Sequence, residues 1–136
     1  MSTVSDRLQC VVVTPERTLF DQSVDFVALP LYDGELGVAP GRAPLIGRLG
    51  YGEMRTNAGG VTHRYFLDGG FAQVRNNVVT VLTNRAIPAE QIDPTAVAAE
   101  LERAKAQPAP TEVQRDAKAK AIDRARAQIR IASKRS

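Results

Sequence analysis

The chain of 136 residues contains one cysteine and one histidine, and this scarcity excludes several kinds of site. Cys10 has no second thiol for a disulfide, and a zinc site built from several cysteine and histidine ligands cannot be assembled. His63 lacks a credible nucleophile and acid partner, which argues against a Ser-His-Asp hydrolase. We therefore expect no catalytic and no metal-binding residues. So low a cysteine content is typical of a reducing, intracellular compartment.

The sequence also lacks long apolar runs, and its N-terminal three quarters contain no lysine. The N-terminus, MSTVSDRLQCVVV, is too polar for a signal peptide or a membrane helix, so we expect neither export nor insertion into a bilayer. Residues 34–45, GELGVAPGRAPL, have the glycine density of a phosphate-binding loop but lack its Gly-Lys-Ser/Thr end, and the first lysine is Lys105. These glycines and prolines instead predict a shaped surface loop that contacts a partner.

The charge is distributed unevenly. Residues 1–91 contain 8 Arg and 9 Asp or Glu (net −1), whereas residues 92–136 contain 10 Lys or Arg and 6 Asp or Glu (net +4). Such a basic tail is compatible with a solvated surface or, as the alternative function, with a nucleic-acid-binding module that uses the basic C-terminal helix. However, every aromatic residue precedes residue 72, so none can stack bases beside that helix.

Short β-type runs rich in Val, Thr, Phe and Tyr extend to about residue 84, which is the pattern of a sandwich or barrel. Cys10 lies in a run that is apolar on both faces, which predicts core packing, and His63 is expected to be a strand residue. Asn76-Asn77 predicts a two-residue hairpin turn, and Asp68-Gly69-Gly70 predicts another turn. Strands are predicted at residues 8–14, 18–20, 24–31, 36–39, 52–57, 61–67, 71–75 and 78–83.

An alanine-rich helical pattern follows residue 88. Asp93 is the predicted N-cap of a first helix over residues 94–107, with proline at its first position. Two further prolines end that helix, and a capping box of Thr111 and Gln114 is expected to open a second helix that reaches about residue 133.

The apolar seam of the second helix is narrow. Alanine side chains bury few carbon groups, and each buried CH₂ group contributes only about 0.8 kcal/mol. Because ordering the helical pair costs entropy, the pair is predicted to dock only weakly. The pair is therefore expected to be able to leave its resting place. The predicted seam consists of Val113, Ala117, Ala121, Ala125, Ile129 and Ala132.

Five segments carry a resemblance to a known family. They are VTPERTLF at residues 13–20, GELGVAPGRAPL at 34–45, FLDGGFAQV at 66–74, VTVLTNRA at 79–86 and the Ile92-Asp93 start of the helical pair. In this order and spacing the chain resembles the epsilon subunit of the F-type ATP synthase. The resemblance implies a mainly β protein with an α tail: a ten-stranded β-sandwich over residues 1–87, then an antiparallel two-helix hairpin over residues 88–136.

The resemblance also implies a function. Such a subunit is a non-catalytic part of the central stalk, lies between the gamma subunit and the ring of c subunits, and couples ion flow to ATP synthesis. Its C-terminal helices inhibit ATP hydrolysis by the alpha/beta catalytic head. The expected location is peripheral to the membrane, on the cytoplasmic face of the bacterial inner membrane or its organelle equivalent, with no nucleic acid as partner.

Residue roles follow only from the resemblance. The family's glycine-rich loop faces the c ring, which makes Glu35 and Arg42 the expected ring contacts. The family commonly has histidine where this chain has Arg42, so a permanent cation replaces a titratable ring. The expected brake on the catalytic head is the basic face of the second helix, formed by Arg115, Arg126, Arg130 and Lys134.

Some family members bind ATP on the folded hairpin through a signature Ile/Leu-Asp-x-x-Arg-Ala. This chain keeps Ile92 and Asp93 but has Ala96 and Val97 in place of the arginine and alanine. We therefore expect no required cofactor and at most a weak regulatory ATP, because the signature arginine is lost. The assisting arginines that match by spacing are Arg103, Arg126 and Arg130.

Overall fold

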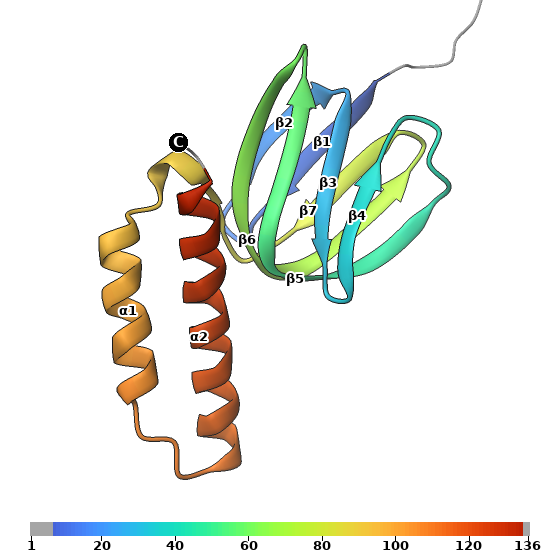
Figure 1. Cartoon of the computed structure of the whole chain (residues 1–136). Helices are drawn as coiled ribbons and strands as arrows, with labels where there is room; N and C mark the ends of the chain where they lie inside the picture. The colour runs from blue at the N-terminus through green and yellow to red at the C-terminus, as the bar shows by residue number, and fades with distance from the viewer. Residues whose placement is uncertain (1–6, 135–136) are drawn as a thin grey trace, which may run out of the picture.

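The computed structural model describes residues 7–134, which form a β-sandwich with a helical hairpin beside it (Figure 1). The helices are α1 (Pro94–Ala106) and α2 (Glu112–Ser133), and α2 lies between α1 and the sandwich. A short 3-10 turn, η1 (Ala89–Gln91), connects the last strand to the hairpin. The expected order, a β-sandwich followed by an α-helical hairpin, is confirmed.

Eight strands are described, and they form one sheet in the order β2-β1-β7-β6-β5-β3-β4, with β8 paired to β6. All pairs are antiparallel except β1 with β7. β5 and β6 bend, so that the sheet folds over on itself (Figure 1). The eight strands are roughly consistent with the ten that were predicted, because β5 and β6 are each long enough to count as two. The bounds are β1 (Leu8–Val13), β2 (Thr18–Val24), β3 (Phe26–Leu31), β4 (Gly34–Val38), β5 (Leu45–Ala58), β6 (Val61–Arg75), β7 (Val78–Leu82) and β8 (Ala86–Pro88).

The sandwich core forms where alternate residues of the strands point inward. In β1, Leu8, Cys10 and Val12 are buried and alternate with more exposed neighbours, as the period of two requires. The core role predicted for Cys10 is thus confirmed. Asn76 and Asn77 adopt φ values of 51° and 62°, which confirms the predicted hairpin turn between β6 and β7.

The turn predicted at Asp68-Gly69-Gly70 is wrong, because these residues lie inside β6 and join two predicted strands into one. Gly69 and Gly70 have φ values of +70° and +109°, which bend the strand without ending its pairing. A Cβ atom on Gly70 would lie 1.9 Å from the carbonyl oxygen of Leu82 in β7. Glycine is therefore required for both the conformation and the close approach.

Both helices begin as the sequence predicts. Asp93 caps α1, and its Oδ1 accepts hydrogen bonds from the N–H groups of Thr95 (3.0 Å) and Ala96 (3.3 Å). The capping box of Thr111 and Gln114 opens α2, with both reciprocal hydrogen bonds present. The hairpin is therefore defined locally by its caps, before any contact with the sandwich.

The predicted seam of α2 is only partly correct, because its N-terminal half projects beyond the sandwich (Figure 1). Val113 is 79% exposed, whereas Ala125 and Ala132 are buried. Contact with the sandwich is thus concentrated in the second half of α2. The apolar cluster there comprises Phe66, Ala89, Ile92, Val97, Ala125, Ala127, Ile131 and Ala132.

Candidate functional site: the interface between hairpin and sandwich

The hairpin packs against outward-facing residues of β5 and β6. The register places Tyr51 opposite Asp68 and Glu53 opposite Phe66, so these four side chains share one face. Phe66 is completely buried under the hairpin, whereas its neighbour Leu67 points into the sandwich core. Successive side chains of β6 therefore point to opposite faces: one face packs into the sandwich core, and the other contacts α2.

A buried carboxylate joins α2 to the sandwich. The side chain of Asp68 is 9% exposed and accepts hydrogen bonds from two arginines: Arg124 Nε of α2 to Oδ1 at 2.7 Å, and Arg85 Nε to Oδ2 at 3.3 Å. The Arg124 guanidinium also lies 4.9 Å from the centre of the Tyr51 ring and donates to the Tyr51 hydroxyl at 3.4 Å. We call this group of Asp68, Arg85, Arg124 and Tyr51 the Asp68 clasp.

Backbone contacts hold the clasp in place. The N–H of Asp68 donates to the carbonyl of Arg85 at 3.1 Å, and Asn84 Nδ2 donates to the carbonyl of Asp68 at 3.3 Å. Burial lowers the pKa of the Arg124 guanidinium, but the hydrogen bond and charge of Asp68 raise it more, so the net direction is upward. The contact with Asp68 thus favours the charged form of Arg124.

Arg124 was not predicted from the sequence, because the basic residues of the second helix were assigned to an outward-facing surface for a partner and not to a contact with the sandwich. A signal was present in the run FLDGGF, where Asp68 is a lone acidic residue among apolar strand residues. A charge in such a position is rarely buried without a partner. This rule would have directed attention to the arginines of the tail.

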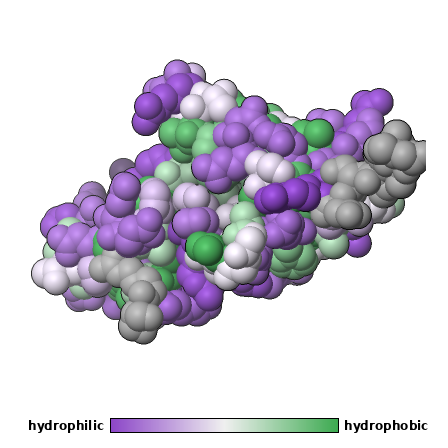
Figure 2. All heavy atoms as spheres, turned by 90° about the horizontal axis from the view of Figure 1, so that it is seen from above, coloured by the Kyte–Doolittle hydropathy of each residue, from purple (hydrophilic) through white to green (hydrophobic). Residues whose placement is uncertain are grey.

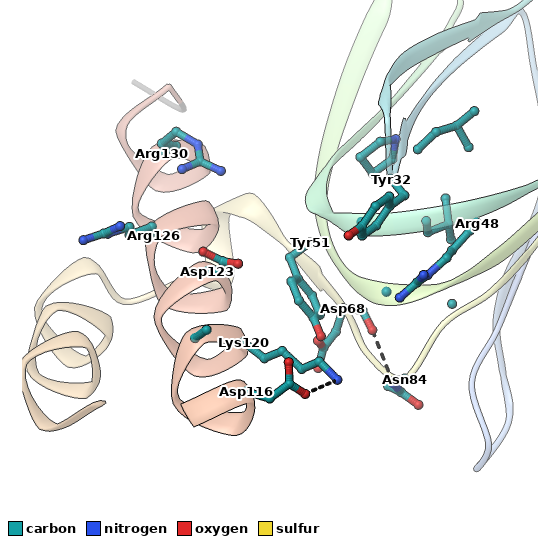
Figure 3. A pocket seen from close by; sticks show the side chains of 17 residues that line it. Tyr32, Arg48, Tyr51, Asp68, Asn84, Asp116, Lys120, Asp123, Arg126 and Arg130 are labelled. Atoms are coloured by element: carbon teal, nitrogen blue, oxygen red, sulfur yellow. Dashed lines mark hydrogen bonds and ion pairs between the residues drawn. The ribbon is translucent and has the colours of Figure 1, made fainter. Parts of the chain in front are cut away.

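A cleft of about 770 Å³ lies beside the clasp, between the sandwich and α2 (Figure 3). Its lining is mostly charged or polar, with Arg48 stacked 4.5 Å above the Tyr32 ring and Lys120 paired with Asp116 within α2 at 3.1 Å. Apolar packing of α2 against the sandwich is therefore confined to the helix's C-terminal half. The labelled residues of the cleft are Tyr32, Arg48, Tyr51, Asp68, Asn84, Asp116, Lys120, Asp123, Arg126 and Arg130.

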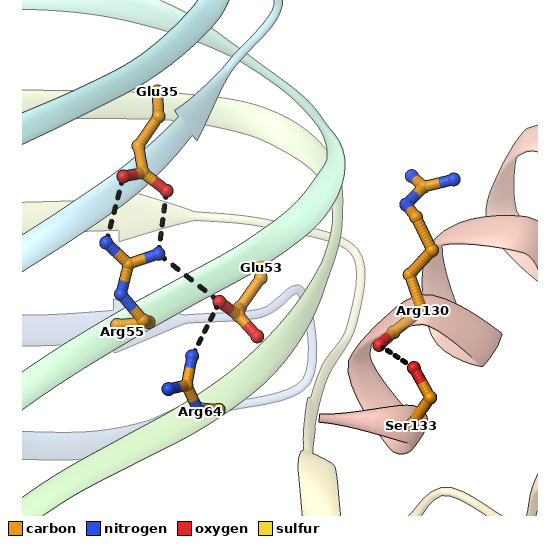
Figure 4. Close-up of polar contacts among 6 residues, drawn as sticks. All are labelled: Glu35, Glu53, Arg55, Arg64, Arg130 and Ser133. Carbon is orange, nitrogen blue, oxygen red and sulfur yellow. Dashed lines mark hydrogen bonds and ion pairs between the residues drawn. The ribbon is translucent and has the colours of Figure 1, made fainter. Parts of the chain in front are cut away.

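A second charged network extends from β4 across β5 to β6 (Figure 4). Glu35 accepts two hydrogen bonds from Arg55, at 2.7 and 2.8 Å, and these hold the pKa of Glu35 below its usual range. Glu53, only 9% exposed, accepts from Arg55 at 3.3 Å and from Arg64 at 3.0 Å. A cavity of about 240 Å³ lined by Glu35, Glu53 and Lys134 separates this network from the end of α2.

The structure does not bring the two predicted ring contacts together. Glu35 lies at the start of β4, faces the C-terminal end of α2 and is bound by Arg55. Arg42 is exposed and borders a separate hollow next to the β6–β7 turn. Its loop is fixed there because the N–H of Gly41 donates to Asn77 Oδ1 at 2.8 Å. Any surface that binds both residues must therefore span both hollows.

The five residues predicted for ATP are also not gathered around one cavity. Ile92 is buried in the hairpin cluster, and the carboxylate of Asp93 caps α1. Arg103 lines a hollow between the two helices near their connection, whereas Arg126 and Arg130 line the cleft against the sandwich. ATP binding stays a prediction.

Three of the predicted brake residues belong to α2 and the fourth, Lys134, is its C-cap; Arg126 and Arg130 also border the cleft against the sandwich. Arg115, Arg126, Arg130 and Lys134 are all exposed, and Arg115 donates to the carbonyl of Pro110 at 3.1 Å. None of the four forms an ion pair with another residue between positions 7 and 134. Their charges are available to a partner.

Three apolar side chains are exposed on the outer surface of the sandwich. Phe71 of β6 pairs directly with Leu82 of β7, and both are more than half exposed. Ile46 of β5, 74% exposed, shares their face by register. We call these three residues the outer apolar face. Viewed from above, by contrast, the molecule is mostly hydrophilic, with apolar side chains in small separate groups (Figure 2).

No group of three or more His, Cys, Asp or Glu side chains in residues 7–134 is placed to hold a metal ion. Neither α1 nor α2 is long and apolar enough to cross a membrane. His63 is an exposed residue of β6, as predicted.

Comparison with known proteins places the chain among subunits of one complex. Residues 7–89 match the family model of the ATP synthase delta/epsilon chain β-sandwich domain. The chain is 54% identical over 123 residues to the ATP synthase epsilon chain of Rhodopirellula baltica (90% of this chain, 96% of that one). It is 39% identical over 120 residues to the epsilon chain of Desulforamulus reducens (88% and 86%). A chain in the cryo-EM structure of the Euglena gracilis mitochondrial ATP synthase, which contains OSCP, F1 and the c-ring, superposes with a TM-score of 0.83 at 25% identity (93% and 81% covered).

Proposed function

This chain belongs to the ATP synthase epsilon-chain family, and on that premise we propose that it is the central-stalk subunit that couples the c ring to the catalytic head. The observation that carries the proposal is the match to epsilon chains over the sandwich and the hairpin together. The subunit is non-catalytic. The comparisons give no support to the alternative of a nucleic-acid-binding module.

The outer apolar face is the surface we assign to the gamma subunit. Ile46, Phe71 and Leu82 are 74%, 55% and 52% exposed, so complete burial of each by a partner would contribute about 1–2 kcal/mol. The face belongs to rigid paired strands, so it requires no ordering on binding. None of its three residues belongs to the apolar cluster under the hairpin, so the hairpin can move while the sandwich stays bound.

Glu35 and Arg42 are the residues that we assign to the c ring. Because they lie at different hollows, they would contact different loops of the ring. Arg55 holds Glu35 in its charged form, and Arg42 carries a permanent charge. We therefore expect the contact to be insensitive to pH near neutrality.

The hairpin is the regulatory part. In its docked position it buries the C-terminal half of α2, and the four predicted brake residues form no ion pair with another residue between positions 7 and 134. An extended α2 would carry these charges beside gamma, where carboxylates of the catalytic beta subunits would pair with them and oppose rotation in the hydrolysis direction. Pairs in a confined space are screened less by salt than surface pairs. Docking frees the rotor, and extension restrains it.

A regulatory ATP, if it binds, binds weakly. The signature arginine is replaced by Ala96, and the remaining arginines border different cavities. We place the subunit in a membrane-associated complex, on the cytoplasmic face of the bacterial inner membrane. The single buried cysteine is compatible with a reducing compartment.

Removal of the hairpin tests the regulatory function. In the assembled complex, deletion of residues 92–136 should leave assembly and ATP synthesis largely intact and should raise the rate of ATP hydrolysis. Replacement of Arg115, Arg126 and Arg130 by alanine should give part of the same increase. A hydrolysis rate that is unchanged by the deletion would show that the hairpin does not inhibit hydrolysis.

A further inference from the structure

We propose that the Asp68 clasp holds the hairpin in its docked position and sets how readily α2 is released. The inference rests on the function proposed above, which it deepens by naming the residues that control the regulatory movement. It assigns to Asp68 and Arg124 a positioning role, since neither needs to touch the catalytic head.

The position of Arg124 on α2 is the first argument. Buried residues of α2 begin at Ala125 and continue to Ala132, and none precedes Arg124 among the residues that the structure describes. Arg124 therefore stands where the docked half of the helix meets the projecting half. A contact at this boundary is the first to break when the helix is peeled from its projecting end, and the last to form when it docks.

The chemistry of the contact is the second argument. The ion pair of Arg124 with Asp68 is the one that joins α2 to the sandwich strands within residues 7–134. The other ion pair of α2 in this part of the chain, Lys120 with Asp116, is internal to the helix. Charge-assisted hydrogen bonds are about twice as strong as neutral ones and depend on geometry, so the clasp fixes both the attachment and the rotation of α2.

The clasp is also built to be reversible. Asp68 has a second partner, Arg85, which belongs to the sandwich and stays with Asp68 when α2 leaves. When α2 is released, Asp68 therefore keeps an ion-pair partner, whereas a buried carboxylate without one would make release very costly. The departing Arg124 is already one third exposed and becomes fully hydrated. The pair is strong enough to favour docking, but it does not make docking permanent.

Amide hydrogen exchange on the isolated full chain tests the clasp directly. In Asp68→Asn and in Arg124→Gln, exchange in residues 124–132 should accelerate about tenfold or more, because a hydrogen bond to a charged group is lost. The double variant should be no faster than the faster single variant, since both break one contact. Arg124→Lys should restore part of the protection, because it keeps the charge but loses the Nε geometry.

Two controls separate the clasp from general loss of structure. Lys120→Gln removes a charge from the same helix and the same cleft without touching the sandwich, so exchange should stay within about twofold of the natural chain. The Cys10 thiol is buried in the sandwich core and should stay unreactive in every variant, which shows that the sandwich remains folded. Unchanged exchange in Asp68→Asn and Arg124→Gln would overturn the proposal.

Hydrolysis in the assembled complex distinguishes failure of the clasp from failure of the brake. If both are right, Asp68→Asn lowers hydrolysis by freeing the hairpin to extend, whereas deletion of residues 92–136 raises it. Faster exchange together with a deletion that has no effect would support the clasp and overturn the brake. A deletion that raises hydrolysis, combined with exchange that the clasp variants do not change, would support the brake and overturn the clasp.

Discussion

Ile131→Ala should shift the hairpin from its docked to its released position by a predictable amount. Ile131 is 2% exposed and packs in the cluster around Phe66, at the end of α2 that contacts the sandwich. The substitution removes three carbon atoms from this interface. At about 0.8 kcal/mol per buried carbon group, docking loses about 2.4 kcal/mol, which corresponds to roughly a fiftyfold shift in the equilibrium between the two positions.

The assay is amide exchange of α2 in the isolated chain, with Val113→Ala as the matched control. Val113 lies on the same helix but is 79% exposed, so its truncation should change exchange less than about twofold. Ile131→Ala should accelerate exchange in residues 124–132 and leave the strands protected. Equal effects of the two substitutions, or exchange in α2 that neither alters, would refute the assignment of docking to this cluster.

Three further predictions concern the sandwich. Gly70→Ala should lower the free energy of unfolding, measured by chemical denaturation, by more than about 2 kcal/mol. Gly59→Ala is the control and should lower it by about 1 kcal/mol, because a Cβ atom added there meets nothing within 4 Å. Burial, and secondarily the charge of Asp21, raise the pKa of Cys10 to about 12. A thiol reagent at pH 8 should therefore label Cys10 only after unfolding, and rapid labelling of the native chain would contradict this. The contribution of the neutral thiol to stability should be lost as the pH rises from about 9 to about 12. The double variant Glu35→Ala, Arg42→Ala should weaken attachment of the subunit to the complex or uncouple proton flow from ATP synthesis, without unfolding the sandwich. If the variant stays in the complex and coupling is unchanged, these residues do not contact the c ring.

Local signals in the sequence predict much of the fold. The capping residues Asp93 and Thr111 determine where the helices begin, and Asn76-Asn77 determines a hairpin turn, because each acts through its own neighbours. The turn predicted at Asp68-Gly69-Gly70 failed because positive φ at glycine is compatible with a bent strand as well as with a turn. Only the pairing with β5 and β7 distinguishes the two, and pairing is not local.

The interface of the hairpin was less predictable for a physical reason. Periodicity identifies the apolar side of α2, but it does not tell how far along the helix the sandwich extends, and so Val113 was expected to be covered. The partner of Arg124 lies 56 residues earlier in the chain. No spacing rule relates such residues, and only the lone acidic Asp68 in an apolar strand pointed toward a buried pair.

The central claim is that the hairpin regulates the complex by moving between a docked and an extended position. Imaging of the assembled complex with ATP, and again after ATP is removed, tests this claim most directly by locating residues 92–134. The account predicts two populations, one with α2 on Phe66 and Asp68 and one with α2 beside the gamma subunit. A hairpin that stays docked on the sandwich under both conditions, while the hydrolysis rate still changes, would contradict it.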